Sequence, residues 1–426
     1  MMNPIPIALA SLHRNAFTAG LFVVIVALAA ALGVAISAQE RTLREGSARA
    51  ADRFDLIVAA PGSLNDLLFS VVYLDPVAVE LLAPNVTQRL MAEPRADFVA
   101  PIGFGDDVDG APVIGTISAF VEHLSGGIAE GRVFAAPEEA VVGALSPHQI
   151  GDVLHVGHGG GDADLAADAL ASDNEDHHHD HDHDHDDAEH DHDEHDHEDL
   201  LVVGRMQPTG TPWDRAIVVP IEYNWEAHGL GNGHAEGDTH IGPPFAPDAL
   251  PGVPALVVKP TDVAAAYGLR GAYRSTDSTA FFPAEVLTQL YAVLGDATAI
   301  MGGLTLAAQA LVVAAILAGI VAILDLQRQR FAVLRALGAP RRFVFATVWL
   351  YVAAIVVTGA VAGMALGWVF ATLLSEYLAQ TTGISMRAAI GLREVHSVGI
   401  FVLLGLVLAT IPALLIYRRP VIESLR

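Results

Sequence analysis

Four uncharged apolar runs constrain this chain more than any other feature of its sequence. A bilayer core about 30 Å thick requires roughly 20 apolar residues in a helix that rises about 1.5 Å per residue. Runs of that length occupy residues 16–38, 299–324, 343–375 and 397–417. With 52% hydrophobic residues overall, they predict an integral membrane protein with one membrane helix near the N-terminus and three near the C-terminus.

Charge and cysteine content exclude several classes of protein. The formal net charge is −26 and the one lysine is Lys259, whereas a nucleic-acid-binding protein needs a basic surface for the phosphates. The chain has no cysteine, which excludes disulfides, iron–sulfur clusters, thiolate zinc sites and a cysteine nucleophile. No nucleic-acid partner is therefore expected.

The arginines in the short loops predict the orientation of the chain. Residues 325–342 hold five arginines against Asp325, and the tail 418–426 is also basic, whereas residues 376–396 are neutral. Because basic segments resist translocation, the loop 325–342 and the tail are expected in the cytoplasm. Counting back through the helices puts residues 1–15 inside, residues 376–396 outside, and the large segment 39–298 in the periplasm.

The charges around the first helix favour the opposite orientation, since Arg14 precedes the helix and four arginines follow it closely. Taken alone it predicts the reverse orientation, and a cleaved signal peptide near Ser37 is a second alternative. Long domains translocate largely regardless of their charge, so the C-terminal loops decide the orientation here.

The segment 39–298 has the sequence features of a folded α+β domain. Short apolar runs separated by Gly and Pro predict strands near residues 56–60, 140–145, 152–156, 201–206, 216–221 and 255–259. The charged, proline-free residues after 38 predict that the first membrane helix continues outward. Pro283 and the apolar face that follows predict a helix leading into the second membrane segment. These two extensions would form stalks, and the whole chain is assigned to the α+β integral membrane class.

The loop 325–342 has the pattern of a basic amphipathic helix. Phe331, Leu334 and Leu337 share one face, the arginines lie on the other, and Gly338 and Pro340 end the helix. Such a helix on the cytoplasmic side predicts a docking surface for a soluble partner. The alternative is an interfacial helix that only contacts membrane lipid headgroups.

Two motifs resemble those of a known family. The run FAVLRALGAPRRFVF, from Phe331 to Phe345, is similar to the loop signature of MacB/FtsX-type ABC transporter permeases, and the basic ending after Pro412 resembles the end of the same family. The stretches 130–156 and 201–220 resemble the MacB-like outer core. The resemblance implies a permease dimer, with a separate cytoplasmic ATPase that docks on Arg328, Arg330, Leu334, Arg335, Leu337, Gly338, Arg341 and Arg342.

The chain itself lacks the motifs of an ATPase. A Walker A loop needs Gly-Lys-Ser/Thr, but Lys259 stands between Val258 and Pro260. There is also no H-E-x-x-H motif of a zinc protease. The protein is therefore expected to be a non-catalytic permease subunit, with ATP hydrolysed by its partner.

The third apolar run carries Gly359, Gly363 and Gly367, a double G-x-x-x-G. Small residues at this spacing allow two helix backbones to approach closely in lipid. The sequence leaves open whether the partner helix belongs to the same chain or to the second copy of a permease dimer.

Residues 173–199 form a His/Asp-rich run with ten histidines, fifteen acidic residues and almost no apolar anchor, which predicts disorder without ligand. Imidazole and carboxylate together bind Zn²⁺, and also copper or nickel, so a metal-collecting loop is predicted; the alternative is a solvated acidic spacer. His155 and His158 flank the run, whereas His228, His234 and His240 are expected in a surface loop. The candidate ligands are His177, His178, His179, His181, His183, His185, His190, His192, His195 and His197.

The leading hypothesis is a multi-pass inner-membrane permease subunit that couples an ATPase to mechanical work in the periplasm and is linked to zinc or another transition metal. A periplasmic metal-binding protein or a lipoprotein is its expected load, and no intrinsic cofactor is expected. The alternatives are an FtsX-like regulator of cell-wall hydrolases and a lipoprotein-release permease with an incidental His-rich loop. A zinc carrier is least favoured, because the four apolar runs contain no ionisable metal ligand.

Overall fold

The structure is a computed structural model that describes residues 3–158, 199–326, 339–386, 388–411 and 414. It divides into two compact units, which are treated separately below. The first unit comprises Met1–Ser47 and Gln289–Arg426, and the second comprises Ala48–Thr288.

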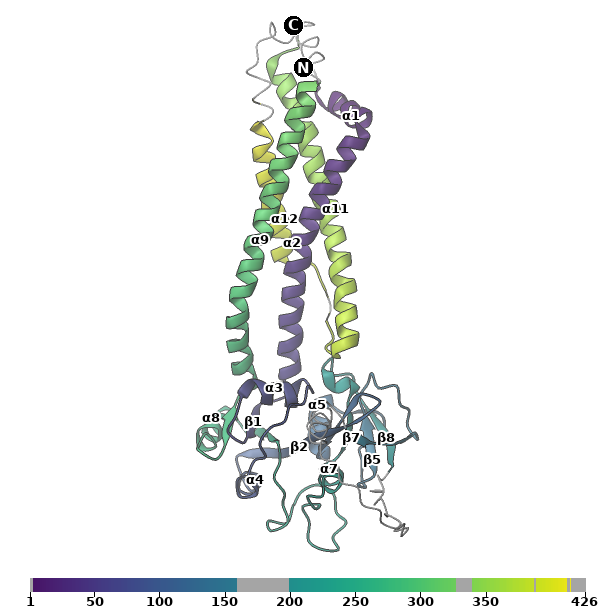
Figure 1. Cartoon of the computed structure of the whole chain (residues 1–426), viewed down its shortest axis with the longest axis vertical. Helices are drawn as coiled ribbons and strands as arrows, with labels where there is room; N and C mark the ends of the chain where they lie inside the picture. The colour runs from purple at the N-terminus through teal and green to yellow at the C-terminus, as the bar shows by residue number, and fades with distance from the viewer. Residues whose placement is uncertain (1–2, 159–198, 327–338, 387, 412–413, 415–426) are drawn as a thin grey trace, which may run out of the picture. The chain divides into compact units, whose positions relative to one another are not determined.

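Long helices make up the first unit (Figure 1). They are α1 (Ile5–Arg14), α2 (Ala16–Ala51), α9 (Pro283–Leu326), α11 (Arg341–Thr382) and α12 (Leu392–Leu408). Among the described residues, three segments are long and apolar enough to cross a membrane: Ala16–Ala51, Gly302–Gly319 and Arg342–Thr382. They coincide with the first three predicted spans. The fourth predicted span overlaps α12, whose 17 residues leave the count of four membrane helices a prediction.

Three of these helices are much longer than a membrane span. The helix α2 is continuous over 36 residues, α9 over 44 and α11 over 42, compared with about 20 needed to cross a bilayer. The extensions of α2 and α9 were predicted, and α9 begins at Pro283, where the missing N–H group of proline costs no helical hydrogen bond. Tyr291 of α9 contacts α2 here: its hydroxyl donates to the Arg44 carbonyl at 3.3 Å, and the Arg44 guanidinium lies over its ring.

An apolar core joins the helices of the first unit. Val26 and Ala30 of α2 are buried with Ile355 and Val356 of α11 and with Phe401 of α12. Lipid tails are as apolar as these side chains, so close packing rather than water exclusion holds such helices together. Small residues along α2 permit that packing.

The helix α1 was not anticipated, because residues 1–15 were interpreted only as an N-terminal cytoplasmic segment. It packs beside α11, and Leu12 contacts the core of the unit. Its last turn carries His13 and Arg14, which interact favourably with the negative end of the helix dipole.

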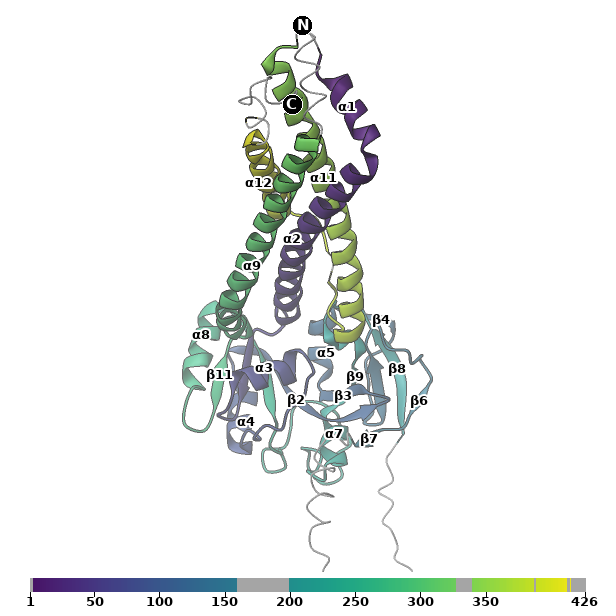
Figure 2. The same ribbon diagram turned by 45° about the horizontal axis from the view of Figure 1, so that its top comes forward.

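The second unit is built on a mixed sheet (Figure 2). Its described strands run in the order β11-β1-β10-β2-β3-β9-β5-β8-β4, with β6 beside β8 and β7 beside β2. They are β1 (Leu56–Ala59), β2 (Ala96–Val108), β3 (Ala111–Thr116), β4 (Ile128–Gly131), β5 (Glu139–Val142), β6 (Val153–Leu154), β7 (Gly157–His158), β8 (Leu200–Met206), β9 (Ile217–Pro220), β10 (Ala255–Pro260) and β11 (Thr279–Phe281). All six predicted strands are present as β1, β5, β6, β8, β9 and β10.

The long strand β2 links the two parts of this sheet and was not predicted. Its first half pairs with β10 and its second half with β3. The register shifts between Phe104 and Asp106, at Gly105. Gly105 has φ +146°, a backbone conformation that residues other than glycine rarely adopt. Acidic residues interrupt the apolar pattern of β2, so the sequence of this segment did not predict a strand.

Short helices cover the sheet: α3 (Leu64–Val72), α4 (Pro84–Met91), α5 (Ser118–Ser125), the 3-10 helix η1 (Pro212–Arg215), α7 (Ile221–Ala227) and α8 (Val263–Ala272). Two cores hold the unit together. One contains Phe54, Phe120 and Trp213, with the last two rings 5.5 Å apart edge to face, a favourable arrangement for aromatic pairs. The other lies between β5, β8 and β9.

Candidate functional site

The His/Asp run lies between strands β7 and β8 in the sequence. The strand β6, which comes just before β7, pairs antiparallel with β8. All ten candidate histidines lie outside the described residues, so their role stays a prediction. Asp199, the last residue of the run, is described, and its Oδ1 lies 2.5 Å from Nδ1 of His155, which precedes the run.

A buried carboxylate lies near the same end of the loop. The backbone of His158 in β7 is in register with Asp106 of β2. Asp106 is buried, its Oδ1 is 3.7 Å from His228 Nε2, and its Oδ2 accepts from the Asn224 amide at 3.4 Å. The amide and the imidazole offset the cost of burying this charge. His155 contacts Asp199, whereas Asp106 contacts His228 and Asn224, so these residues form two separate polar clusters.

The structure corrects one interpretation in the loop that follows α7. His228 and His240 are exposed, as expected for a surface loop, but His234 is buried with 5% exposure. Its imidazole pairs with Glu222 of α7, a partner that sequence alone did not indicate. Among the described residues, no group of three His, Asp or Glu side chains could hold a metal ion.

The predicted coupling region is only partly described. Arg328, Arg330, Leu334, Arg335, Leu337 and Gly338 lie outside the described residues. Pro340 is the N-cap residue of α11, and Arg341 and Arg342 are its first residues. Arg342 is exposed.

The three glycines of α11 lie against α2 of the same chain. A Cβ atom added at Gly359 would lie 2.5 Å from Val26 Cβ, and one at Gly367 would lie 2.9 Å from Val34 Cβ. At Gly363 it would meet the Ala27 carbonyl oxygen and lie 2.7 Å from Ala30 Cβ. No real Cβ contact is this short, so each position admits only glycine while the two helices stay this close.

An ion pair that the sequence did not reveal joins α2 to the start of α12. Glu394 is fully buried; its Oε1 lies 3.5 Å from Arg41 Nε and accepts from the Ser37 hydroxyl at 3.1 Å. Its Oε2 accepts from the Gly391 N–H group at 2.7 Å, and Arg41 also donates to the Ala389 carbonyl. The available signal was a glutamate at the third position of a helix, where its side chain caps the N-terminus.

These contacts also set the protonation of Glu394. Burial raises the pKa of Glu394. The backbone hydrogen bonds, Arg41 and Ser37 together lower it by more than burial raises it, so the pKa lies below the ordinary value of a glutamate. The carboxylate is therefore ionised at neutral pH, as the ion pair with Arg41 requires.

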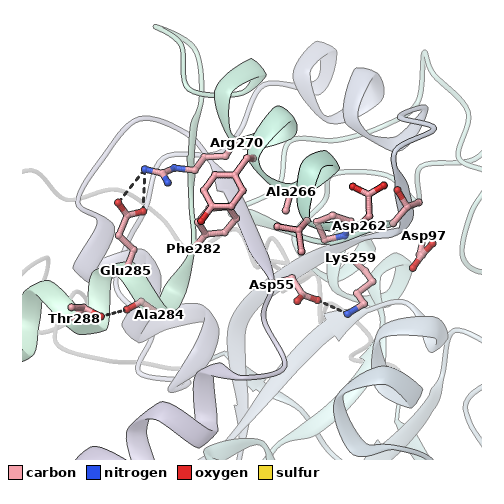
Figure 3. Close-up of a pocket in the computed structure, with 14 residues that line it drawn as sticks. Asp55, Asp97, Lys259, Asp262, Ala266, Arg270, Phe282, Ala284, Glu285 and Thr288 are labelled. Carbon is pink, nitrogen blue, oxygen red and sulfur yellow. Dashed lines mark hydrogen bonds and ion pairs between the residues drawn. The ribbon is translucent and has the colours of Figure 1, made fainter.

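A pocket of about 740 Å³ opens on the second unit beside β10, α8 and the start of α9. Figure 3 shows Lys259 directed at Asp55 and Arg270 directed at Glu285, with ion-pair distances of 2.8 and 3.1 Å. Asp97 and Asp262 also line it, so its carboxylates outnumber its cations. This charge does not suit a phosphate-bearing ligand, and Lys259 is an ion-paired residue of a strand rather than part of a phosphate-binding loop.

Comparison with known proteins places the C-terminal helices in a family. Residues 302–423 match the model of the FtsX-like permease C-terminal family. Among solved structures, the chain is similar to the periplasmic region of MacB from Actinobacillus actinomycetemcomitans, at 9% identity and a TM-score of 0.31 over 57% of this chain and 95% of that chain. No curated protein sequence matches. The family match contains the run from Phe331 to Phe345 and most of the basic ending, so residues 302–423 resemble the C-terminal region of FtsX-like permeases.

Proposed function

We propose that this permease couples a separate cytoplasmic ATPase to mechanical work outside the inner membrane, and that its His/Asp run links this work to zinc or another transition metal. Its family is generally a non-catalytic component of ABC transporters and implies an ATPase partner and dimerisation. The observation that carries the mechanical part is the length of α2 and α9, because rigid helices longer than a bilayer transmit displacement beyond it.

Coupling requires a surface on which the ATPase docks. The arginine-rich residues 325–342 carry net positive charge, and α11 begins within the end of this segment, at Arg341. A push on this loop would therefore act on the first turn of α11. Because α11 packs along α2 through Gly359, Gly363 and Gly367, the displacement would pass to α2 as well.

Reversing charge at Arg335 and Arg341 together (Arg335→Glu, Arg341→Glu) should abolish association with the ATPase while the permease still inserts. The expected loss is at least tenfold in ATPase recovered with the affinity-purified permease, since a charge reversal turns attraction into repulsion at a docking surface. The matched control reverses Arg89 and Arg274, two exposed arginines of the second unit. Equal ATPase recovery from both double variants would rule out this docking surface.

The metal part of the proposal depends on the composition of the run. Ten histidines and fifteen carboxylates within 27 residues offer many equivalent ligand sets, which favours a collector with fast exchange over one fixed geometry. The ligand nitrogens must be deprotonated, so metal affinity should fall as the medium acidifies below pH 6 to 7, the approximate range in which histidine titrates. A periplasmic metal-binding protein is the corresponding candidate load.

Replacing residues 173–199 with a Gly/Ser linker of equal length tests this role in the native host. Growth across a chelator series should fail at a higher zinc concentration than in wild type, and added zinc should restore it. A full deletion of the gene is the reference. If the linker strain grows like wild type while the deletion shows an envelope defect at every zinc level, the metal role is wrong. A regulator of cell-wall hydrolases or a lipoprotein-release permease would then fit better.

A further inference from the structure

The pocket beside β10 and α8 is not used by the proposed coupling. Its volume of about 740 Å³ lies within the range of roughly 300–1,000 Å³ that is typical of sites for small organic ligands. The two cations that line it lie on opposite sides of Phe282 (Figure 3). Each already has one carboxylate as its partner, Lys259 with Asp55 and Arg270 with Glu285.

Two further carboxylates, those of Asp97 and Asp262, line the same pocket, and its two cations are already paired with other residues. Both side chains are exposed. Asp262 is the N-cap residue of α8, where its Oδ1 accepts from the Ala265 N–H group at 2.8 Å. This bond fixes the carboxylate and leaves Oδ2 for a ligand. Four carboxylates against two cations give the lining a formal net charge of −2.

A bulge in the sheet sets the position of Asp97. In the pairing of β10 with β2, Lys259 is opposite Phe98, but Pro260 is opposite Ala96, so Asp97 is an extra residue of β2. Such a bulge breaks the regular alternation of side chains and redirects the extra one.

The chain beyond β10 stays close to this bulge, because the Thr261 N–H group donates to the Arg95 carbonyl at 2.9 Å. Asp262 follows directly in the sequence. The backbone therefore holds Asp97 and Asp262 at the same end of the pocket, where Figure 3 shows both near Lys259.

The helix α8 provides an apolar wall next to this acidic end. Val263 and Tyr267 are one helical turn apart and both line the pocket, with exposures of 73% and 63%. The Tyr267 ring lies edge to face on Phe282, with the ring centroids 5.2 Å apart, which holds the tyrosine in place. Exposed apolar side chains suit the apolar part of a ligand, and the face of an aromatic ring attracts a cation.

We propose that this pocket binds a small organic ammonium ion with an apolar body. The ammonium group lies between Asp97 and Asp262, to which its N–H groups donate charge-assisted hydrogen bonds. The apolar body lies against Val263 and Tyr267. The negative lining excludes anions, and no group of three His, Asp or Glu side chains among the described residues could hold a bare metal ion here.

The probe for this site is 2-phenylethylammonium, titrated calorimetrically into the full-length protein in lipid nanodiscs, with empty nanodiscs as the blank. Residues 173–199 are replaced by the Gly/Ser linker, since that acidic run would also attract a cation. One ion per chain should bind. The neutral analogue 2-phenylethanol should bind at least about tenfold more weakly, because it cannot form the charged hydrogen bonds.

The double variant Asp97→Asn, Asp262→Asn should also weaken binding of the probe at least about tenfold. Asparagine is as good an N-cap residue as aspartate, so α8 keeps its cap and only the charge is lost. Tyr267→Ala should weaken binding by removing the apolar wall. Asp248→Asn, at an exposed aspartate outside the pocket, is the matched control and should bind like the parent.

Three results would each overturn the site: no binding of the probe, equal binding of the amine and the alcohol, or equal binding by the double variant and the Asp248 control. Neither the ATPase nor the His/Asp run takes part in this titration. A failure here would therefore leave the proposed coupling and metal role as they stand, and their failure would leave this site untouched.

Discussion

Gly363→Leu should prevent α11 from packing against α2. A Cβ at this position meets the backbone oxygen of Ala27 and lies 2.7 Å from Ala30 Cβ, and a backbone cannot move aside as a flexible side chain does. Overpacking in a close-packed core costs about 1–3 kcal/mol and more where backbone is displaced. We expect a destabilisation above about 3 kcal/mol, visible as loss of monodisperse protein in size-exclusion chromatography and a lowered unfolding temperature.

Gly399→Leu in α12 is the matched control, because an added Cβ there meets nothing within 4 Å. It should leave the elution profile and unfolding temperature unchanged. The pair of variants also separates the two interpretations of the glycine repeat that the sequence left open. If Gly363→Leu changes only the dimer fraction and not the stability of the fold, the repeat belongs to the contact between permease copies.

The sequence predicted those helices and strands whose hydrophobic pattern can be recognised within a short stretch of residues. Uncharged runs predicted α2 and the membrane parts of α9 and α11, and short continuous apolar runs rich in Val and Ile predicted β1, β8, β9 and β10. In both cases the hydrophobic pattern lies within a single helix or strand and reflects the apolar surroundings of that element. The resemblance to FtsX-like permeases followed from two short motifs, which are also local features of the sequence.

Features that depend on distant residues could not be predicted. Glu222 and His234 are twelve residues apart in a glycine-rich stretch, and only the folded loop brings their side chains to 3.1 Å. Glu394 and Arg41 are separated by most of the chain, and each looks like an ordinary charged residue at a helix end. The strand β2 was missed because it passes between two parts of the sheet, so its polar residues face different neighbours along its length.

Breaking the ion pair between Arg41 and Glu394 should be the second most damaging change. Glu394 is fully buried, whereas Arg41 is 27% exposed. Arg41→Met leaves the buried carboxylate without its cation, which costs about 3–5 kcal/mol. Glu394→Met should destabilise the protein less, because the remaining Arg41 is partly exposed and lies 3.9 Å from Glu45. The double variant should be less destabilised than the sum of the two, because neither charge is then left alone.

The pH dependence provides an independent check on this pair. A carboxylate whose folded pKa is depressed contributes stability above its unfolded pKa, and that contribution is lost as pH falls through the folded value. Arg41 is one of the groups that lower the pKa of Glu394, so Arg41→Met should raise this pKa and shift the loss of stability to higher pH. Glu394→Met should show no such transition.

Chemical unfolding of the solubilised protein at several pH values measures both effects. Arg393→Met is the matched control, since Arg393 adjoins Glu394 but is 72% exposed and lies 4.0 Å from Glu40. Exposed pairs contribute about 0–1 kcal/mol, so this variant should resemble wild type. If Arg41→Met unfolds like Arg393→Met, the start of α12 is not held to α2 by this pair. The coupling of the two helices would then rest on the apolar contacts of Phe401 and Val26.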